Sequence, residues 1–307
     1  MLRRLKPLYW IYNLFRPRAL AHNQEPYRQL DLKKKYFSSV SSADFIGVDP
    51  DQLALPDVGP VRETEFYRQA SPETQQSIDG FANEGYCVIR EMLDAATVDR
   101  MNEAIRELID NGKIDFTYRT KLMFAVRKSP TLAAPFQDAD WLQLLDCLIG
   151  GRARLFQSIN FLEGSQQRTH SDSIHMTTFP LGGLLGVWIA LEDIHPASGP
   201  LHYYPGSHHL PYFLNGDYEN EGGVLTIGDK AYRDYEDLVA AKLEETAFQK
   251  KILLARKGDV LIWHANLLHG GEPVTDPTKS RKSMVLHYFD DNRVCYHEIT
   301  QRPALFK

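Results

Sequence analysis

The segment KGDVLIWHANLLHGGEP, residues 257–273, holds a turn, a short apolar run and a histidine followed by two glycines. Its first three residues are a turn signal, and the continuous apolar run 260–263 is typical of a strand buried on both faces. Similar short segments, separated by turn residues, lie at 153–162, 174–179, 184–191, 201–204, 252–256 and 283–289. Many short strands at close spacing predict a β-sandwich or a closed barrel.

The chain before residue 150 carries helical patterns instead. Ser71-Pro72 predicts the start of a helix that runs to about residue 83, and Asp94 predicts the cap of an amphipathic helix that ends at Gly112. A short strand is expected at 86–90 and a further helix at 138–149. The sequence therefore predicts an α+β, mainly β domain over residues 71–307. Its parts are a helical layer at 71–150 and a β-core at 151–300, interrupted at about 212–250 by an acidic insertion with a helix near 234–248, which we expect to act as a lid.

Residues 1–20, MLRRLKPLYWIYNLFRPRAL, form a basic and aromatic N-terminal arm. A short helix from Pro7 to about Phe15 would be aromatic and flanked by cations, which suits peripheral contact with an anionic bilayer through residues 1–18. The other interpretation is an arm that packs across the domain or against a subunit partner, and the sequence leaves both open. Residues 20–70 are polar, contain prolines and show no sustained periodicity, so we expect the rest of 1–70 to be extended or irregular.

The composition of the 307 residues excludes some classes of protein. A net charge of -5 argues against a nucleic-acid binder, which would carry a strongly basic surface. The three cysteines are too few and too scattered for a disulfide framework, which favours a reducing, cytoplasmic location, with the inner face of a membrane as a further option. No apolar run approaches the roughly 20 residues of a membrane-spanning helix. The oligomeric state is not indicated by the sequence.

The pair His170 and Asp172, with the distant His269, predicts a metal site. Residues two apart on a strand point to the same side, so both can reach one ion. Two imidazoles and one carboxylate can occupy one face of octahedral Fe(II) and leave three positions for a bidentate co-substrate and O2. His264 is a competing third ligand, but Gly270-Gly271 favours His269 because glycines allow close backbone approach.

Arg281 is the expected cation for the far carboxylate of a chelating 2-oxoacid, because a guanidinium binds a carboxylate through two hydrogen bonds. The alternative is a solvated charge in the run 279–282. Other histidines have simpler interpretations. His287 is expected to be a packed strand residue, and His175 either faces the substrate or lies on a strand surface.

Several motifs together resemble the phytanoyl-CoA dioxygenase family of Fe(II)/2-oxoglutarate oxygenases. They are His170-Ser171-Asp172, then GVWIALEDIHPASGPLHYYPGSHHL, then KGDVLIWHANLLHGGEP, then Arg281, with GYCVIREML and LLDCLIGG in the N-terminal half. The resemblance covers residues 75–290 and leaves out the first 60 residues and the insertion.

The resemblance implies a double-stranded β-helix (jelly-roll) core with helices packed on one side. It implies that His170, Asp172 and His269 bind the iron and that Arg281 holds 2-oxoglutarate. Three further residues match positions that line the co-substrate pocket: Gln157, Trp188 and, less closely, Lys121. A serine that helps in some members is replaced here by Gly271, and Ser283 is the candidate substitute.

The expected activity is that of a dioxygenase that consumes 2-oxoglutarate and O2, hydroxylates an unactivated C–H bond and releases succinate and CO2, with ascorbate as the reductant in vitro. Halogenating relatives carry glycine or alanine at the carboxylate position, so Asp172 favours hydroxylation. The alternative is a cupin-like metal-binding protein or isomerase, which would not need Arg281. The substrate is expected to be a small molecule or a lipid-linked one.

Overall fold

The computed structural model describes residues 4–118 and 120–306. Its main element is a seven-stranded antiparallel sheet in the order β1-β9-β6-β11-β4-β3-β2. The strands are β1 (Tyr86–Ile89), β2 (Phe116–Thr117), β3 (Lys121–Met123), β4 (Ala153–Phe161), β6 (Leu184–Ala190), β9 (Val260–His264) and β11 (Ser283–Asp290). A second sheet has the order β10-β7-β8, from β7 (Leu201–Tyr203), β8 (Lys251–Leu253) and β10 (His269–Gly271). A third, β13-β12-β5, contains β5 (Thr177–Phe179), β12 (Val294–His297) and β13 (Arg302–Pro303).

The helices are mostly short. They are α1 (Lys6–Leu14), α2 (Pro17–Leu20), α3 (Gln24–Gln29), α4 (Glu65–Gln69), α5 (Pro72–Asp79), α6 (Phe81–Glu84), α7 (Ala95–Asp110), α8 (Pro130–Ala133), α9 (Ala139–Ile149) and α10 (Tyr232–Glu244). The expected helix at 72–83 is divided into α5 and α6 at Gly80. Ser71 and Asp94 cap α5 and α7 by accepting the backbone N–H of Thr74 and Thr97.

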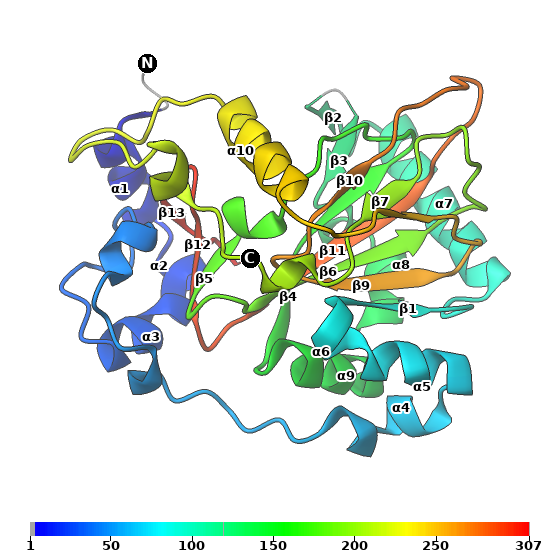
Figure 1. Ribbon diagram of the computed structural model, residues 1–307, viewed down its shortest axis with the longest axis horizontal. Coiled ribbons are helices and arrows are strands. Elements are labelled where there is room, and N and C mark those ends of the chain that lie inside the picture. Colours follow the sequence, from blue (N-terminus) through cyan, green and yellow to red (C-terminus); the bar gives the residue numbers. More distant parts are fainter. Residues whose placement is uncertain (1–3, 119, 307) are drawn as a thin grey trace.

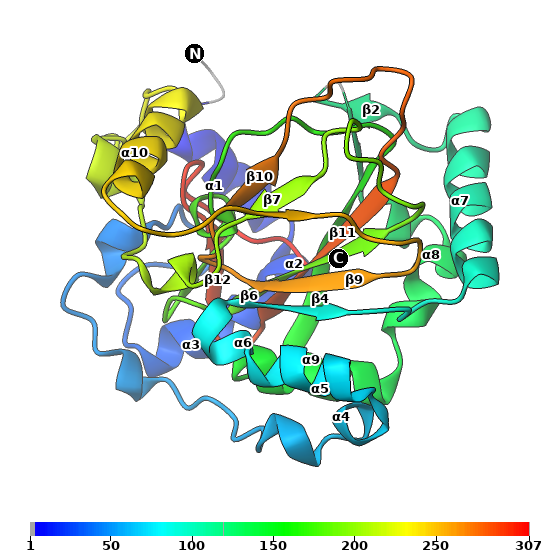
Figure 2. The ribbon, with the colours of Figure 1, turned by 45° about the vertical axis from the view of Figure 1, so that its right-hand side comes forward.

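The two faces of the large sheet pack against different layers. In β6, Leu185, Val187 and Ile189 point into a core shared with α7 and α9, as the alternation along the strand predicts. The alternate residues Trp188 and Ala190 point to the other face, into a second core shared with the small β10-β7-β8 sheet. Figures 1 and 2 show α5, α7 and α9 on one face of the large sheet, with β7 and β10 on the other. These helices therefore cover one side of the large sheet, and the second core lies between the large sheet and the small one.

Residues 20–70 are irregular, as we expected, only in part, mainly at 30–41 and 53–60. They contain α3, α4 and several single-turn 3-10 helices. Their apolar side chains, among them Tyr27, Val40 and Phe45, form a small core with Val294 and Tyr296 of β12. The correction has a physical reason. Apolar residues spaced for isolated turns show no helical period, yet each turn is stabilised by packing on a sheet that lies far away in sequence.

The insertion at 212–250 contains α10 and the single-turn helix η10 (Asn215–Tyr218). Tyr235 and Val239 of α10 pack with Ile174 and Leu268, which lie next to the predicted metal ligands in sequence. Between η10 and α10 the chain pairs with the N-terminal arm, through a bridge between Leu5 and Thr226. Within residues 4–118 and 120–306, no helix is long and apolar enough to cross a membrane.

Candidate metal centre and co-substrate pocket

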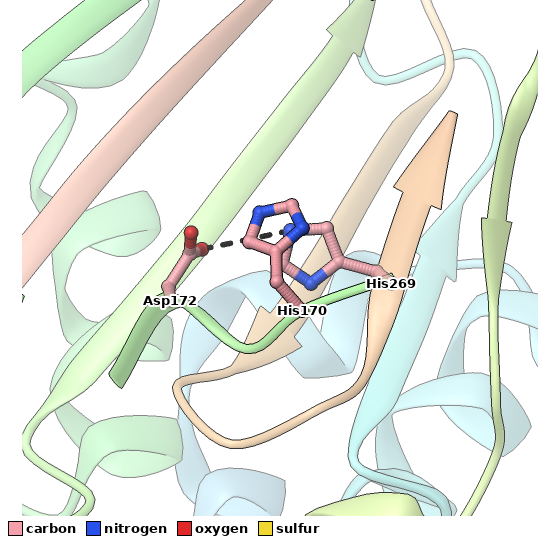
Figure 3. Close-up of side chains that lie close together, drawn as sticks. All are labelled: His170, Asp172 and His269. Atoms are coloured by element: carbon pink, nitrogen blue, oxygen red, sulfur yellow. Dashed lines mark ion pairs between the residues drawn. The ribbon is translucent and has the colours of Figure 1, made fainter. Parts of the chain in front are cut away.

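His170, Asp172 and His269 meet in one buried cluster, with their ligand atoms within 4.8 Å of one another. The backbone brings the two histidines together, because the N–H of each donates to the carbonyl of the other at 2.9 Å. Their ring centroids are 4.6 Å apart. Asp172 is the first residue of a 3-10 turn (Asp172–Ile174) and does not lie on a strand. The strand that we expected at 174–179 is shorter and consists of β5 alone. Figure 3 shows its carboxylate directed toward the imidazoles, with His269 Nε2 at 3.9 Å.

Both histidines are held in the tautomer that a metal needs. His170 Nδ1 donates to the carbonyl of Arg168 at 2.8 Å, and His269 Nδ1 donates to the carbonyl of Leu267 at 2.9 Å. This leaves the lone pair of each ring on Nε2, the nitrogen that a metal would bind, and in His170 this atom lies 3.1 Å from the side-chain amide nitrogen of Gln167. Burial lowers the pKa of His170 well below its usual value, so this imidazole stays neutral.

Asp172 is oriented by two residues whose role the sequence did not indicate. Its Oδ2 accepts the indole N–H of Trp263 at 2.8 Å and lies 3.4 Å from Nε2 of His287. Burial alone would raise the pKa of this carboxyl, but the neighbouring imidazoles of His269 and His287 hold it well below its usual range. The carboxylate is therefore ionised and fixed, with Oδ1 left for a metal.

His287 is the packed strand residue that we expected, buried in β11, and it also contacts Asp172. Trp263 also packs its ring on His269, with centroids 4.6 Å apart. It fits because Gly186 lies opposite on β6, where a Cβ would come within 2.2 Å of the indole. A glycine opposite a tryptophan on the neighbouring strand could have indicated that Trp263 positions Asp172. Recognising this pair requires the strand register, which a single sequence does not give.

The competing ligand His264 lies outside the cluster. Its ring packs on His208 with centroids 5.3 Å apart, and its Nδ1 accepts the backbone N–H of Asn266. His175 lies nearer, with its ring 6.2 Å from His170 and 4.8 Å from Tyr232 of α10. Burial lowers the pKa of His175 to about 4, so the ring is neutral beside the cluster.

Arg281 is not a solvated surface charge, because only 2% of the residue is exposed. Its Nε has no hydrogen-bond partner within the described residues, and its guanidinium lies 5.4 Å from the ring centroid of Phe161. Burial lowers the pKa of Arg281 to about 10. A buried cation without a counter-charge is costly, so the geometry fits a site completed by an anion.

More buried polar atoms surround this part of the sheet without partners among residues 4–118 and 120–306. They are Ser283 Oγ and Trp188 Nε1. Ser283 is paired with Phe161 of β4 on one side and with Ala190 of β6 on the other. These donors and the guanidinium can bind the oxygens of a dicarboxylate.

Lys121 connects the Arg281 region to the metal cluster. Its Nζ lies 6.0 Å from the ring centroid of Phe161, the ring that Arg281 also faces. The same Nζ donates to Gln167 Oε1 at 3.4 Å, and Gln167 Nε2 lies 3.1 Å from Nε2 of His170. Gln157 has a different position, because its amide contacts His287 Nδ1 at 3.3 Å and Met176 Sδ at 3.2 Å. It reaches the cluster through His287.

The fold and the cluster define a class, that of jelly-roll proteins with a His-Asp-His metal site between two sheets. The chain belongs to the phytanoyl-CoA dioxygenase family, whose model matches residues 81–283. The predicted family and fold class are thereby confirmed.

Curated relatives are similar over part of the chain. A phytanoyl-CoA dioxygenase domain-containing protein 1 homolog of Dictyostelium discoideum is 32% identical over 139 residues, which are 43% of this chain and 44% of that protein. The protein of that name from Bos taurus is 47% identical over 45 residues, 15% of this chain and 16% of its own. The matches thus span less than half the length of these relatives.

Solved structures share the fold. The non-heme alpha ketoglutarate dependent carbocyclase SnoK from nogalamycin biosynthesis has a TM-score of 0.58 at 20% identity, covering 76% of this chain and 87% of its own. EctD from S. alaskensis has a TM-score of 0.57 at 20% identity, covering 82% and 90%. Other structures of EctD contain bound Fe, or 2-oxoglutarate with 5-hydroxyectoine.

Proposed function

We propose that this protein is an Fe(II)/2-oxoglutarate-dependent dioxygenase that hydroxylates an unactivated C–H bond of its substrate. The observation that carries the proposal is the pairing of two features. One is a His-Asp-His cluster with both histidines in the metal-binding tautomer. The other is a buried arginine with no acidic partner among residues 4–118 and 120–306, connected to the cluster through Phe161 and Lys121.

In this proposal His170, Asp172 and His269 hold the iron. Trp263 and His287 fix the carboxylate, and the carbonyls of Arg168 and Leu267 fix the two rings. Three protein ligands leave further positions on an octahedral ion for a bidentate co-substrate and for O2. Iron with 2-oxoglutarate and O2 supplies the oxidation, with succinate and CO2 as products.

Arg281 would hold the distal carboxylate of 2-oxoglutarate, and Ser283 and Trp188 would donate hydrogen bonds beside it. Each of the three has a buried polar atom free for that purpose within the described part of the chain. A buried guanidinium paired with a carboxylate is stronger and more directional than a lysine at the same place. Lys121 would add a second cation between this carboxylate and the metal, since its Nζ lies beside Phe161 and Gln167.

The insertion would act as a lid that excludes water and selects the substrate. The hydroxyl of Tyr235 accepts the backbone N–H of Ser171 at 3.1 Å, so α10 is attached to the residue between two proposed ligands. Tyr232 lies against His175, which places both side chains at the edge of the cluster as candidate substrate contacts. The proposed substrate is a small molecule or a lipid-linked one.

Anaerobic addition of Fe(II) and then 2-oxoglutarate to the purified protein tests the first half of the proposal. We expect a metal-to-ligand charge-transfer band that needs both additions and is absent in Arg281→Gln. Succinate release in air, followed over a panel of small metabolites and lipid-linked sugars, would identify a substrate. Incorporation of one atom from 18O2 into the product then distinguishes hydroxylation from epimerisation or ring closure.

The alternative is a jelly-roll metal-binding protein or isomerase without oxygen chemistry. It predicts tight metal binding, no spectral band with 2-oxoglutarate and no succinate with any substrate. That outcome would reject the dioxygenase proposal and leave the metal site intact.

A further inference from the structure

The face of α1 that points away from the domain is apolar. Leu8 is three and four residues before Ile11 and Tyr12, and Phe15 is three and four residues after Tyr12 and Ile11, so the four form one stripe along the helix. Their exposed fractions are 45%, 49%, 45% and 78%. The opposite face is packed, because Asn13 is buried and donates to the carbonyl of Phe37 at 2.9 Å. The arm therefore rests on the domain and still presents an apolar stripe.

A second exposed apolar segment lies beside the first. Val224 and Leu225 of the insertion are 92% and 62% exposed. The N–H of Lys6 donates to the carbonyl of Leu225 at 2.9 Å, and the N–H of Ile227 donates to the carbonyl of Arg4 at 3.0 Å. Figure 1 shows α1 and this segment together at one end of the molecule. We call the set Leu8, Ile11, Tyr12, Phe15, Val224 and Leu225 the α1 surface.

Cations accompany the α1 surface. Lys6, Arg16 and Arg18 lie in or directly after α1. Residues 33–35 are three more lysines. They lie near α1, because the ring of Phe37, two residues further on, packs on Trp10 of α1 with centroids 5.9 Å apart. Lys33 and Lys34 pair with Asp31 and Asp44. For Arg18 and Lys35, no acidic group of the described residues lies within ion-pair distance, so they remain available to an external anion.

We propose that the α1 surface docks this protein on an anionic lipid bilayer. The stripe would enter the boundary between headgroups and acyl chains, with the cations at the level of the phosphates. Trp10 and Tyr12 are residue types that favour this interface. A helix of 9 residues is too short to cross a bilayer and would lie in its plane.

A second copy of the chain fits the α1 surface less well. In a symmetric dimer, the same cations would face one another across the interface, and like charges at close range oppose association. An anionic bilayer instead matches the apolar stripe and the cations Arg18 and Lys35, while the nearby acid Asp229 is paired with Arg4.

Docking has a consequence for the reaction, which rests on the proposed function. The segment that pairs with the arm, Leu225 to Ile227, leads directly into α10, and α10 contacts the metal-binding segment through Tyr235. The bilayer would therefore lie next to the lid. This arrangement favours a substrate carried by a lipid over one taken from solution.

Vesicle binding of the full chain, measured by co-sedimentation without turnover, tests the docking. We expect binding to vesicles of phosphatidylcholine with phosphatidylglycerol, little binding to phosphatidylcholine alone, and weakening as salt is raised. The double variant Ile11→Ser and Phe15→Ser should lower the partition coefficient by about tenfold or more. Neutralising Lys35 or Arg18 to Gln should lower it by about fivefold each. Leu254→Ser, which changes a 50% exposed leucine after β8, should leave it unchanged.

Trp10 gives a second readout that does not depend on the stripe variant. It is 43% exposed, whereas Trp141, Trp188 and Trp263 are buried. Brominated anionic lipids should therefore quench part of the fluorescence, and Trp10→Phe should remove that part.

Three results would overturn the docking proposal. They are no binding to anionic vesicles, binding that the stripe variant leaves intact, and a stable dimer that the stripe variant converts to monomer. None depends on 2-oxoglutarate turnover, so loss of the docking proposal and loss of the dioxygenase proposal can be told apart.

Discussion

The metal cluster and the Arg281 region are both buried, but they differ in how their polar atoms are satisfied. In the cluster, Asp172 Oδ2 and the Nδ1 atoms of both histidines have partners at 2.8–2.9 Å. Around Arg281, the guanidinium Nε, the Ser283 hydroxyl and the Trp188 indole have none within the described residues. The first region is prepared for a cation by the protein itself. In the proposed function an anion completes the second region, and this difference is the reason for assigning the metal to one region and 2-oxoglutarate to the other.

Removing a cluster imidazole should have the largest effect. His269→Ala should lower metal affinity and turnover by more than about 100-fold, because only two of the three protein ligands remain. Anaerobic calorimetry with Fe(II) measures the affinity. His264→Ala is the matched control from the same segment, since its ring packs on His208 outside the cluster. Equal losses of Fe(II) affinity in the two variants would contradict the assignment of His269 as the third metal ligand.

Arg281→Met should separate the two regions. We expect about 100-fold weaker 2-oxoglutarate binding and unchanged metal affinity, because the lost partner is a charge-assisted, two-pronged hydrogen bond. Without 2-oxoglutarate the variant should unfold at a higher temperature than the wild type, since an unpaired buried cation is replaced by an apolar side chain. Lys282→Met, at the neighbouring and more exposed position, is the control. A large drop in melting temperature for Arg281→Met alone would mean that the guanidinium already has a structural partner.

Two of the buried tryptophans, Trp188 and Trp263, give a matched pair of variants. Trp263→Phe removes the donor to Asp172 and should weaken metal binding by about tenfold. Trp188→Phe should leave metal binding unchanged and weaken 2-oxoglutarate by about fivefold, because its N–H is the one without a partner in the described structure. Metal and 2-oxoglutarate titrations of both proteins measure the contrast. If the effects were exchanged, the division into two regions would be wrong.

The attachment of the lid should show the smallest effect. Tyr235→Phe removes the hydroxyl that accepts the Ser171 N–H and should lower the free energy of unfolding by about 1 kcal/mol. Chemical denaturation of the metal-free protein measures it. Tyr218→Phe, in the same small core, is a control that leaves the metal-binding segment untouched. A loss of metal affinity for Tyr235→Phe as large as that for Trp263→Phe would show that the insertion positions the ligands directly.

The sequence was informative where chemistry and local pattern coincide. Alternation along 184–190 and the apolar run 260–263 predicted strands whose two faces pack as expected. The spacing of His170 and Asp172 with a distant histidine pointed to the cluster, and the glycines after His269 distinguished it from His264.

Features that depend on strand register could not be predicted. Trp263 reaches Asp172 only because Gly186 faces it on the neighbouring strand, and His287 reaches Asp172 from β11, on the other side of β6. The short helices of residues 20–70 were missed for a related reason. Their stability comes from packing on β12, which is distant in sequence.

The central claim is that the buried His-Asp-His cluster binds a metal and that the neighbouring Arg281 region binds the dicarboxylate co-substrate. A crystal structure of the full chain, grown with Mn(II) and 2-oxoglutarate, tests it most directly. The account predicts one ion in contact with His170 Nε2, Asp172 Oδ1 and His269 Nε2, with the distal carboxylate of 2-oxoglutarate on Arg281 and Ser283. An ion bound elsewhere, or a carboxylate that leaves Arg281 without a partner, would contradict it.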